Sequence, residues 1–274
     1  MYKIGASIDP KKDISLYHEL KAAGIEFVEI RQGLLELAEQ ADFKEIARNA
    51  KESGITLWSF HLPFGSHRIA YDISWQDSDT RKKVVEINSE FIKKASDIGI
   101  TKMIVHPSSE PIEDNIRAER MKCSKESLMA LAEAAEKCGA VICVEDLPRT
   151  CLGRNSDEML ELLSADERLK MCFDTNHLLN EDIGEFIRKT GKYMATTHIS
   201  DYDFVDERHW LPGEGLIDWN MLYSELKAVG YNGIWLYETW LECPKNMTRE
   251  REATYVDFYK NAMAIFEGRK PEKI

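Results

Sequence analysis

The sequence predicts a (β/α)₈ barrel, and three observations support this fold. Short apolar or β-branched runs alternate about eight times with longer amphipathic segments, which is the pattern of repeated βα units around a parallel sheet. Glycine follows many of the helical segments just before the next strand, as in AAGIEF, ESGITL and DIGITK. The length of 274 residues is close to the roughly 250 typical of such barrels. No Pro/Gly/Ser-rich linker divides the chain, so we expect one domain over residues 1–274.

The elements follow in order along the chain. Strands are predicted where the runs are short and rich in apolar and β-branched residues: 3–8, 26–31, 56–62, 102–106, 140–146, 170–175, 194–200 and 233–239. Helices are predicted in the segments between and after them, several behind a capping Asp, Ser or Thr: 13–23, 42–53, 79–98, 117–138, 156–164, 182–190, 218–229 and 248–266. An open doubly wound sheet is the alternative, and the absence of a GxGxxG turn makes it the weaker one.

Composition narrows the classes of protein. A formal net charge of −12 opposes binding to a phosphate backbone, so a nucleic-acid partner is not expected. No apolar run reaches the roughly 18 residues of a membrane span, and the N-terminus lacks an apolar leader. The cysteines at 123, 138, 143, 151, 172 and 243 form no CxxC pair, which favours reduced thiols. We expect a cytoplasmic protein that has no membrane segment.

Ionisable residues gather where the predicted strands end. The carboxyl ends of barrel strands converge on one face, which carries the active site in essentially every characterised case. Independent structural roles would not place acid or imidazole groups at successive strand ends, so the pattern predicts a shared site. The residues are His61, His106, Glu145, Asp146, Asp174, His177, His198, Asp201 and Glu238, with His209 in the loop after the seventh strand.

Four of these residues, Glu145, Asp174, His198 and Glu238, are predicted to bind a divalent metal ion. Carboxylates beyond apolar strands are costly to desolvate unless a cation pairs with them. Three carboxylates and one imidazole suit Mn²⁺, Mg²⁺ or Co²⁺, and Zn²⁺ is also compatible. Taken singly, each has an ordinary explanation as well: a glutamate pairs with arginine, an aspartate caps a helix, and a strand-end histidine is a hydrogen-bonded loop residue.

Weaker signals concern the substrate. Tryptophans 58, 75, 210 and 240 are candidates for the wall of a sugar pocket, although Trp58 fits the core equally well. The PGEG turn at 212–215 is a weak phosphate signal. The cationic candidates for substrate contact are Arg149, Arg154 and Arg208. Each is by default a solvated surface residue. No cluster demands a phosphate, so an unphosphorylated sugar or polyol is favoured.

The motifs HLPF, VHP, VEDLP, CFDTNH, THISD, RHWLPGEG and YETW resemble the xylose-isomerase-like barrel superfamily over essentially the whole chain. That superfamily holds sugar and sugar-phosphate isomerases and epimerases, inosose dehydratases and the endonuclease IV nucleases. Its epimerase branch implies that Glu145, Asp174, His198 and Glu238 are the metal ligands, that the two glutamates also act as acid and base, and that His177 and Arg208 hold substrate oxygens. His61 and His106 are further candidates for substrate contact.

The nuclease branch uses a polynuclear zinc site, and its additional ligand positions are also filled here, by His61, His106, His177, Glu207 and His209. More than one metal ion is therefore compatible with the sequence. Glu207 stands where the nucleases carry aspartate, and a longer side chain would disturb a tight polynuclear site. The negative net charge and the absence of basic DNA-contacting loops also argue against a nuclease.

The sequence thus predicts an isomerase or epimerase that acts on a small sugar, keto-sugar or polyol through a metal-stabilised enediolate. Glu145 and Glu238 would remove and return the proton. Two bases on opposite faces give epimerisation, and one base that moves the proton between carbons gives isomerisation. The alternatives are a keto-sugar or inosose dehydratase or lyase, a zinc apurinic-site nuclease, and a non-catalytic sugar-binding protein. The sugar, the metal and the oligomeric state stay open, and a homo-oligomer is compatible with the sequence.

Overall fold

Eight parallel strands form a closed barrel in the computed structural model, which describes residues 1–10, 13–31, 41–65 and 71–274. The strands lie in the order β7-β6-β5-β4-β3-β2-β1-β8. The two ends of this order are joined because Ile199 N–H donates to Leu236 O at 2.8 Å and Glu238 N–H donates to Ile199 O at 3.1 Å. The predicted (β/α)₈ fold is confirmed. The strands are β1 Lys3–Ile8, β2 Phe27–Arg31, β3 Thr56–His61, β4 Lys102–Val105, β5 Val141–Glu145, β6 Lys170–Asp174, β7 Met194–His198 and β8 Ile234–Tyr237.

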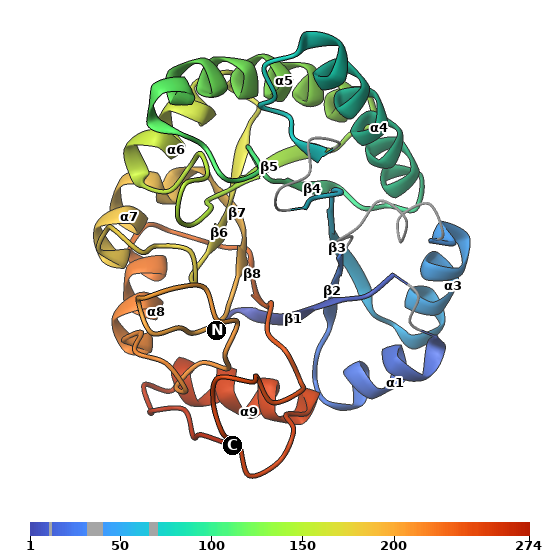
Figure 1. The fold of residues 1–274 in the computed structure, drawn as a ribbon. Coiled ribbons are helices and arrows are strands. Elements are labelled where there is room, and N and C mark those ends of the chain that lie inside the picture. The colour runs from blue at the N-terminus through green and yellow to red at the C-terminus, as the bar shows by residue number, and fades with distance from the viewer. Residues whose placement is uncertain (11–12, 32–40, 66–70) are drawn as a thin grey trace.

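Helices surround the ring of strands, as Figure 1 shows. Many of them begin behind an Asp or Asn whose side chain accepts a backbone N–H of the first turn, for example Asp42, Asp77 and Asn155. Such caps satisfy N–H groups that have no partner inside the helix. Within the described residues no helix is both long and apolar enough to cross a membrane. The helices are α1 Ile14–Ala22, α3 Phe43–Ser53, α4 Ser78–Asp97, α5 Arg117–Lys137, α6 Ser156–Leu163, α7 Ile183–Thr190, α8 Trp219–Ala228 and α9 Tyr255–Phe266, with short 3₁₀ turns η2 Asp114–Ile116 and η3 Gly191–Tyr193.

The last helix begins later than the predicted residue 248. Thr254 and Asp257 form a capping box that starts α9 at Tyr255. The preceding residues are held by the segment after β8 instead, where Ala253 N–H donates to Leu241 O at 2.8 Å. The predicted start was wrong because tertiary contacts of this segment, which periodicity does not show, replace helical hydrogen bonds.

A small apolar cluster inside the barrel lies beneath the carboxyl ends of the strands. Ile104, Cys143 and Cys172 pack together, separately from the main core between strands and helices. Each precedes a predicted site residue by two positions (His106, Glu145 and Asp174), and alternate residues of a strand point to the same side. All six cysteines are free thiols, and burial raises the pKa of Cys143 to about 12. The cluster is therefore an unreactive packed layer beneath the strand ends.

Asp201 organises the loop that carries the PGEG turn. Its carboxylate accepts hydrogen bonds from Gly213 N–H at 2.7 Å, Ile217 N–H at 3.2 Å and Trp219 Nε1 at 2.9 Å. A Cβ on Gly215 would lie 2.3 Å from Asp201 Oδ1, so glycine is required there. The Gly213 N–H that could have approached a phosphate therefore donates to Asp201 instead, and the turn has a structural role.

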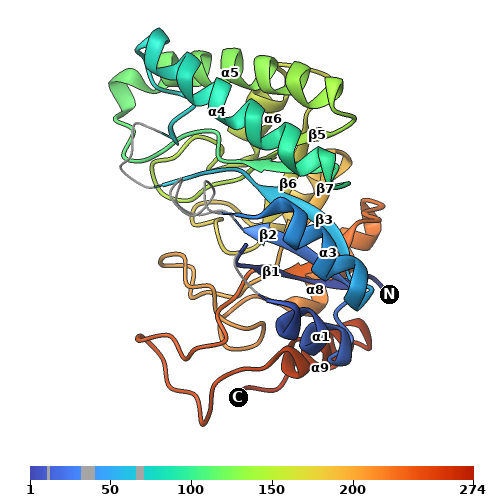
Figure 2. The ribbon, with the colours of Figure 1, turned by 90° about the vertical axis from the view of Figure 1, so that its right-hand side faces the viewer.

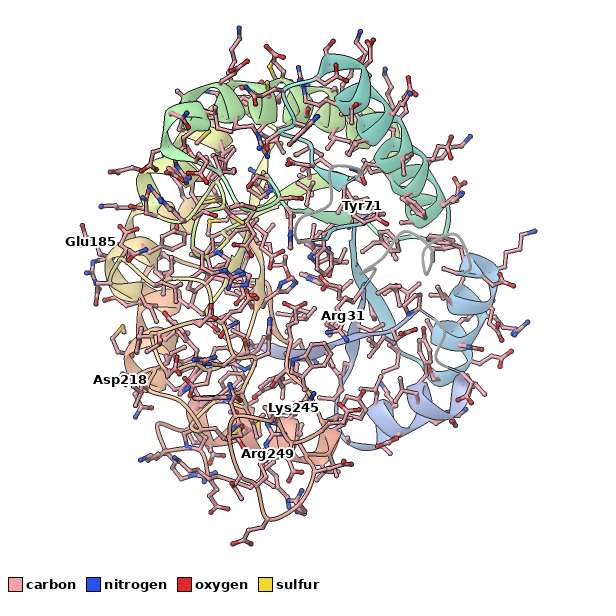
Figure 3. The ribbon with its side chains drawn as sticks, in the orientation of Figure 1. Arg31, Tyr71, Glu185, Asp218, Lys245 and Arg249 are labelled. Carbon is pink, nitrogen blue, oxygen red and sulfur yellow. The ribbon has the colours of Figure 1, made fainter. Side chains whose placement is uncertain are left out.

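Arg249 and Glu214 anchor the connection after β8 to the connection after β7. Figure 2 shows these long loops on the side of the barrel away from the N-terminus, and Figure 3 labels Arg249. The two side chains are 0% and 1% exposed and form two hydrogen bonds of 2.8 Å. Arg249 Nη1 also donates to the carbonyls of residues 240–242. The pair thus holds together two loops that follow the carboxyl ends of β7 and β8.

Arg249→Met is expected to reduce the free energy of unfolding by about 3–5 kcal/mol, because it leaves the Glu214 carboxylate buried without its partner. Urea unfolding followed by circular dichroism measures this change. Arg48→Met is the matched control, since Arg48 is 59% exposed and pairs with an exposed glutamate on α3. A loss in Arg249→Met no larger than in the control would contradict the anchoring role.

Candidate metal centre and active site

The structure brings Glu145, Asp174, His198 and Glu238 together at the carboxyl ends of the strands. One ligand atom from each lies within 4.8 Å of those of the other three. His198 Nδ1 is 2.8 Å from Glu145 Oε1, 3.1 Å from Glu238 Oε2 and 3.8 Å from Asp174 Oδ2. All four side chains are buried. The arrangement is an oxygen-rich group around one imidazole nitrogen.

This group fits a divalent cation. Asp174 Oδ1 accepts from Asn176 N–H at 2.7 Å, whereas Oδ2 is buried and has no hydrogen-bond partner among the described residues. A buried carboxylate oxygen without a donor is costly, and burial raises the pKa of Asp174 to about 6. A cation bound among the three carboxylates would satisfy this oxygen and offset their mutual repulsion.

Two further histidines orient Glu145. His61 Nε2 and His106 Nε2 lie 3.0 and 3.1 Å from its Oε2 atom. His61 Nδ1–H donates to Leu62 O at 2.9 Å, which fixes that ring. Burial raises the pKa of Glu145, but the nearby His198 and His106 outweigh this and hold it well below its usual range. Glu145 is therefore an ionised carboxylate with one oxygen toward His198 and the other toward the histidine pair.

A second group comprises His177, Glu207 and His209, again with ligand atoms within 4.8 Å of one another. His177 Nδ1–H donates to Asp146 O at 2.7 Å, and His209 Nδ1–H donates to Glu238 O at 3.1 Å. These bonds leave Nε2 of each ring for another partner. His177 Nε2 is 3.4 Å from Glu207 Oε2 and 3.7 Å from Asp174 Oδ2, so the two groups adjoin.

A cavity of about 340 Å³ opens onto both groups, which is a volume within the range of small-molecule sites. Glu145 and Glu238 line it, whereas Asp174 and His198 lie beneath them with no exposed surface. Phe64 and Trp240 form an apolar part of the cavity wall. The other charged groups among its described lining are Asp9, Glu110 and Glu207 against Arg31 and Arg149.

The predicted substrate residues differ in their positions. His61, His106 and His177 line the cavity, but Arg208 is not among the described lining residues, and its Nε donates to Asp203 at 2.9 Å. Arg149 lines the cavity instead. Its guanidinium contacts Glu110 at 2.6 Å, Asp206 at 2.7 Å and Glu207 at 3.3 Å, on a backbone with φ 54°. Arg149 links the loops after β4, β5 and β7 through these three carboxylates.

Two site residues on β2 were missed by the sequence analysis. Arg31 ends the strand and lies toward the middle of the ring in Figure 3, with its Cζ 4.5 Å from the centre of the Trp240 ring. Glu29 lies inside the same strand and contacts His198. Their signal was the pair of charged residues at alternate positions, Glu29 and Arg31, in the otherwise apolar strand FVEIR. Trp58 was one of the tryptophans considered for the wall of a sugar pocket. Its Nε1 donates to Thr196 Oγ1 at 3.0 Å, and it is not in the described cavity lining.

A family model described as the xylose isomerase-like TIM barrel matches residues 17–257. The chain belongs to this family. The resemblance inferred from the motifs is confirmed, and the residue groups described above lie at the carboxyl ends of the strands of a xylose isomerase-like barrel.

Individual relatives span two activities. D-psicose 3-epimerase of Ruminiclostridium cellulolyticum is 27% identical over 225 residues, which are 77% of this chain and 72% of the relative. A probable endonuclease 4 of Thermoplasma acidophilum is 24% identical over 164 residues, which are 53% of this chain and 56% of that one. A crystal structure of a D-tagatose 3-epimerase-like protein superposes with a TM-score of 0.81 at 21% identity over 97% of both chains, a likeness that concerns the fold.

Proposed function

We propose that this chain is a divalent-metal-dependent epimerase or isomerase of a small neutral keto-sugar. The observation that carries the proposal is the difference in position within the four-residue group: two glutamates line the cavity, and the other two residues lie beneath them. Glu145 and Glu238 border the cavity from β5 and from the end of β8, while Asp174 and His198 form the floor. Support also comes from the epimerase activity named for the relative in R. cellulolyticum.

The proposed mechanism assigns a proton transfer to each glutamate. When bound, the metal would polarise a substrate carbonyl and lower the cost of negative charge next to it. Glu145 or Glu238, as a carboxylate, removes the proton from the adjacent carbon, and the other glutamate, as a carboxylic acid, returns a proton from its own side, so the two exchange protonation states. His177 and Trp240 are proposed to hold the sugar against the floor, since both line the cavity.

The charge of the cavity supports a neutral substrate. Arg149 is already paired with Glu110, Asp206 and Glu207. Arg31 is the other arginine of the described lining and lies over the Trp240 ring. The lining carboxylates outnumber the arginines, and two like charges about 4 Å apart repel by roughly 1–4 kcal/mol near a protein surface. An anionic sugar is therefore disfavoured relative to its neutral counterpart.

The proposal is tested with the Mn²⁺-loaded protein and a panel of keto-sugars in D₂O, with NMR detection of deuterium at carbon. We expect exchange into neutral ketoses, and at least about tenfold lower kcat/KM for their phosphate esters, since 1.4 kcal/mol corresponds to tenfold. Absence of exchange into every neutral ketose would contradict the proposal.

A nuclease is the second candidate, because His177, Glu207 and His209 adjoin the first group and could hold further metal. It predicts two or three zinc ions per chain, as in a polynuclear site, and cleavage of an abasic oligonucleotide. The Zn²⁺-loaded protein is assayed with that oligonucleotide, and its zinc content is measured. Cleavage without exchange into any sugar would replace the epimerase proposal.

A further inference from the structure

Glu29 is a fully buried carboxylate in the middle of β2, outside the four-residue group. Its Oε1 and Oε2 atoms lie 3.0 and 3.1 Å from His198 Nε2, across the barrel interior from β7. Within the described part of the chain, His198 is the ion-pair partner recorded for Glu29. Such a buried acid is costly unless its contacts are well made, so its position needs an explanation.

Two serines hold the Glu29 carboxylate from the neighbouring strands. Ser59 Oγ donates to Oε2 at 2.7 Å, and Ser7 Oγ donates to Oε1 at 3.2 Å. Ser7 on β1 and Ser59 on β3 are the residues paired with Glu29 in the register of the sheet. The carboxylate is thus fixed by strands on both sides, and among the described residues its other strong contact is the imidazole of His198.

The two nitrogens of His198 have different surroundings. Nε2 faces Glu29, whereas Nδ1 faces Glu145 and Glu238 at 2.8 and 3.1 Å. A neutral imidazole carries one N–H and one lone pair. If the N–H is donated to Glu29, the lone pair is on Nδ1, inside the four-residue group.

We propose that Glu29 is a positioning residue that sets His198 as a metal ligand through Nδ1. It accepts the Nε2–H hydrogen bond and thereby fixes both the tautomer and the orientation of the ring. Carboxylate partners of metal-bound histidines act in this way, and their loss typically costs about 10- to 100-fold in metal affinity or activity. The inference rests on the proposed metal centre and adds to it a residue that does not touch the substrate.

The test measures Mn²⁺ binding by electron paramagnetic resonance together with ¹⁵N NMR of His198 in the Zn²⁺-loaded protein. Glu29→Gln is expected to weaken Mn²⁺ binding about 10- to 100-fold and to weaken or broaden the Nε2–H signal. Glu26→Gln is the matched control: Glu26 immediately precedes β2, is 40% exposed and pairs with Lys3 at 2.7 Å. The control is expected to match the wild type in both readouts.

The outcomes separate this inference from the proposed function. Wild-type protein that binds no divalent metal contradicts the metal centre itself, and this role of Glu29 with it. Wild-type binding together with unchanged affinity and an unchanged Nε2–H signal in Glu29→Gln overturns the Glu29 inference alone. If Glu29→Gln does not fold, Ser59→Ala decides. It removes the 2.7 Å bond to the carboxylate, and wild-type affinity and His198 spectra in it would overturn the inference.

Discussion

Glu238→Gln and Glu145→Gln are each expected to abolish incorporation of solvent deuterium into the substrate, with a fall of about 10²- to 10⁴-fold or more. Glutamine keeps the size of the side chain but has no basic oxygen to take the proton. Burial raises the pKa of Glu238, and the adjacent His198 outweighs this and lowers it below its usual value. A lowered pKa favours the carboxylate form that accepts the substrate proton in the first half of the reaction. NMR of the substrate in D₂O measures the loss of exchange in each variant.

The control must separate lost proton transfer from lost metal, because both glutamates belong to the four-residue group. Bound Mn²⁺ is therefore quantified in each variant at saturating metal. Glu185→Gln is the matched substitution, since Glu185 lies on α7, is 54% exposed and is labelled on the outside of the barrel in Figure 3. Wild-type exchange in either metal-loaded site variant would remove that glutamate from the mechanism.

The fold was predictable because its signals are local. Each βα unit repeats the same short pattern of strand, cap, amphipathic helix and glycine, and the glycines at 24, 54, 99, 139 and 230 have the positive φ that a helix end requires. The convergence of Glu145, Asp174, His198 and Glu238 followed from the same rule, since each stands at the end of a strand or directly after it. Knowledge of the strand ends was sufficient to expect these four side chains together.

The remaining site residues depend on relations that no local pattern contains. Glu29 lies in the middle of a strand, and its role arises from the register that sets Ser7 and Ser59 beside it. Arg149 reaches the cavity through a loop with positive φ, where three carboxylates from other loops hold it. Arg208 pairs with Asp203 in its own loop. Loop conformation decides which arginine faces a cavity. No local sequence pattern predicts that conformation, so the expectation for each arginine was a solvated surface position.

Removal of divalent metal is expected to abolish deuterium exchange and to lower the melting temperature. Three carboxylates in one buried group repel one another without a cation, and Asp174 Oδ2 then has no partner among the described residues. A metal present at 100 times its dissociation constant stabilises the native state by about 2.7 kcal/mol. For a chain of this size that corresponds to a shift of roughly 5–10 °C. Scanning calorimetry with EDTA and after readdition of Mn²⁺ measures it.

Asp174→Asn provides the internal control for this experiment. Asparagine keeps the shape of Asp174 and removes one negative charge from the group, so the metal-free variant is relieved of part of the repulsion. Its melting temperature should consequently be less sensitive to EDTA than that of the wild type, and readdition of Mn²⁺ should restore little. Equal melting temperatures of the wild type with and without Mn²⁺, or full exchange in protein shown by elemental analysis to be free of metal, would contradict a metal at this site. A shift of equal size in Asp174→Asn would place the stabilising ion elsewhere, and the group of His177, Glu207 and His209 is the first place to look for it.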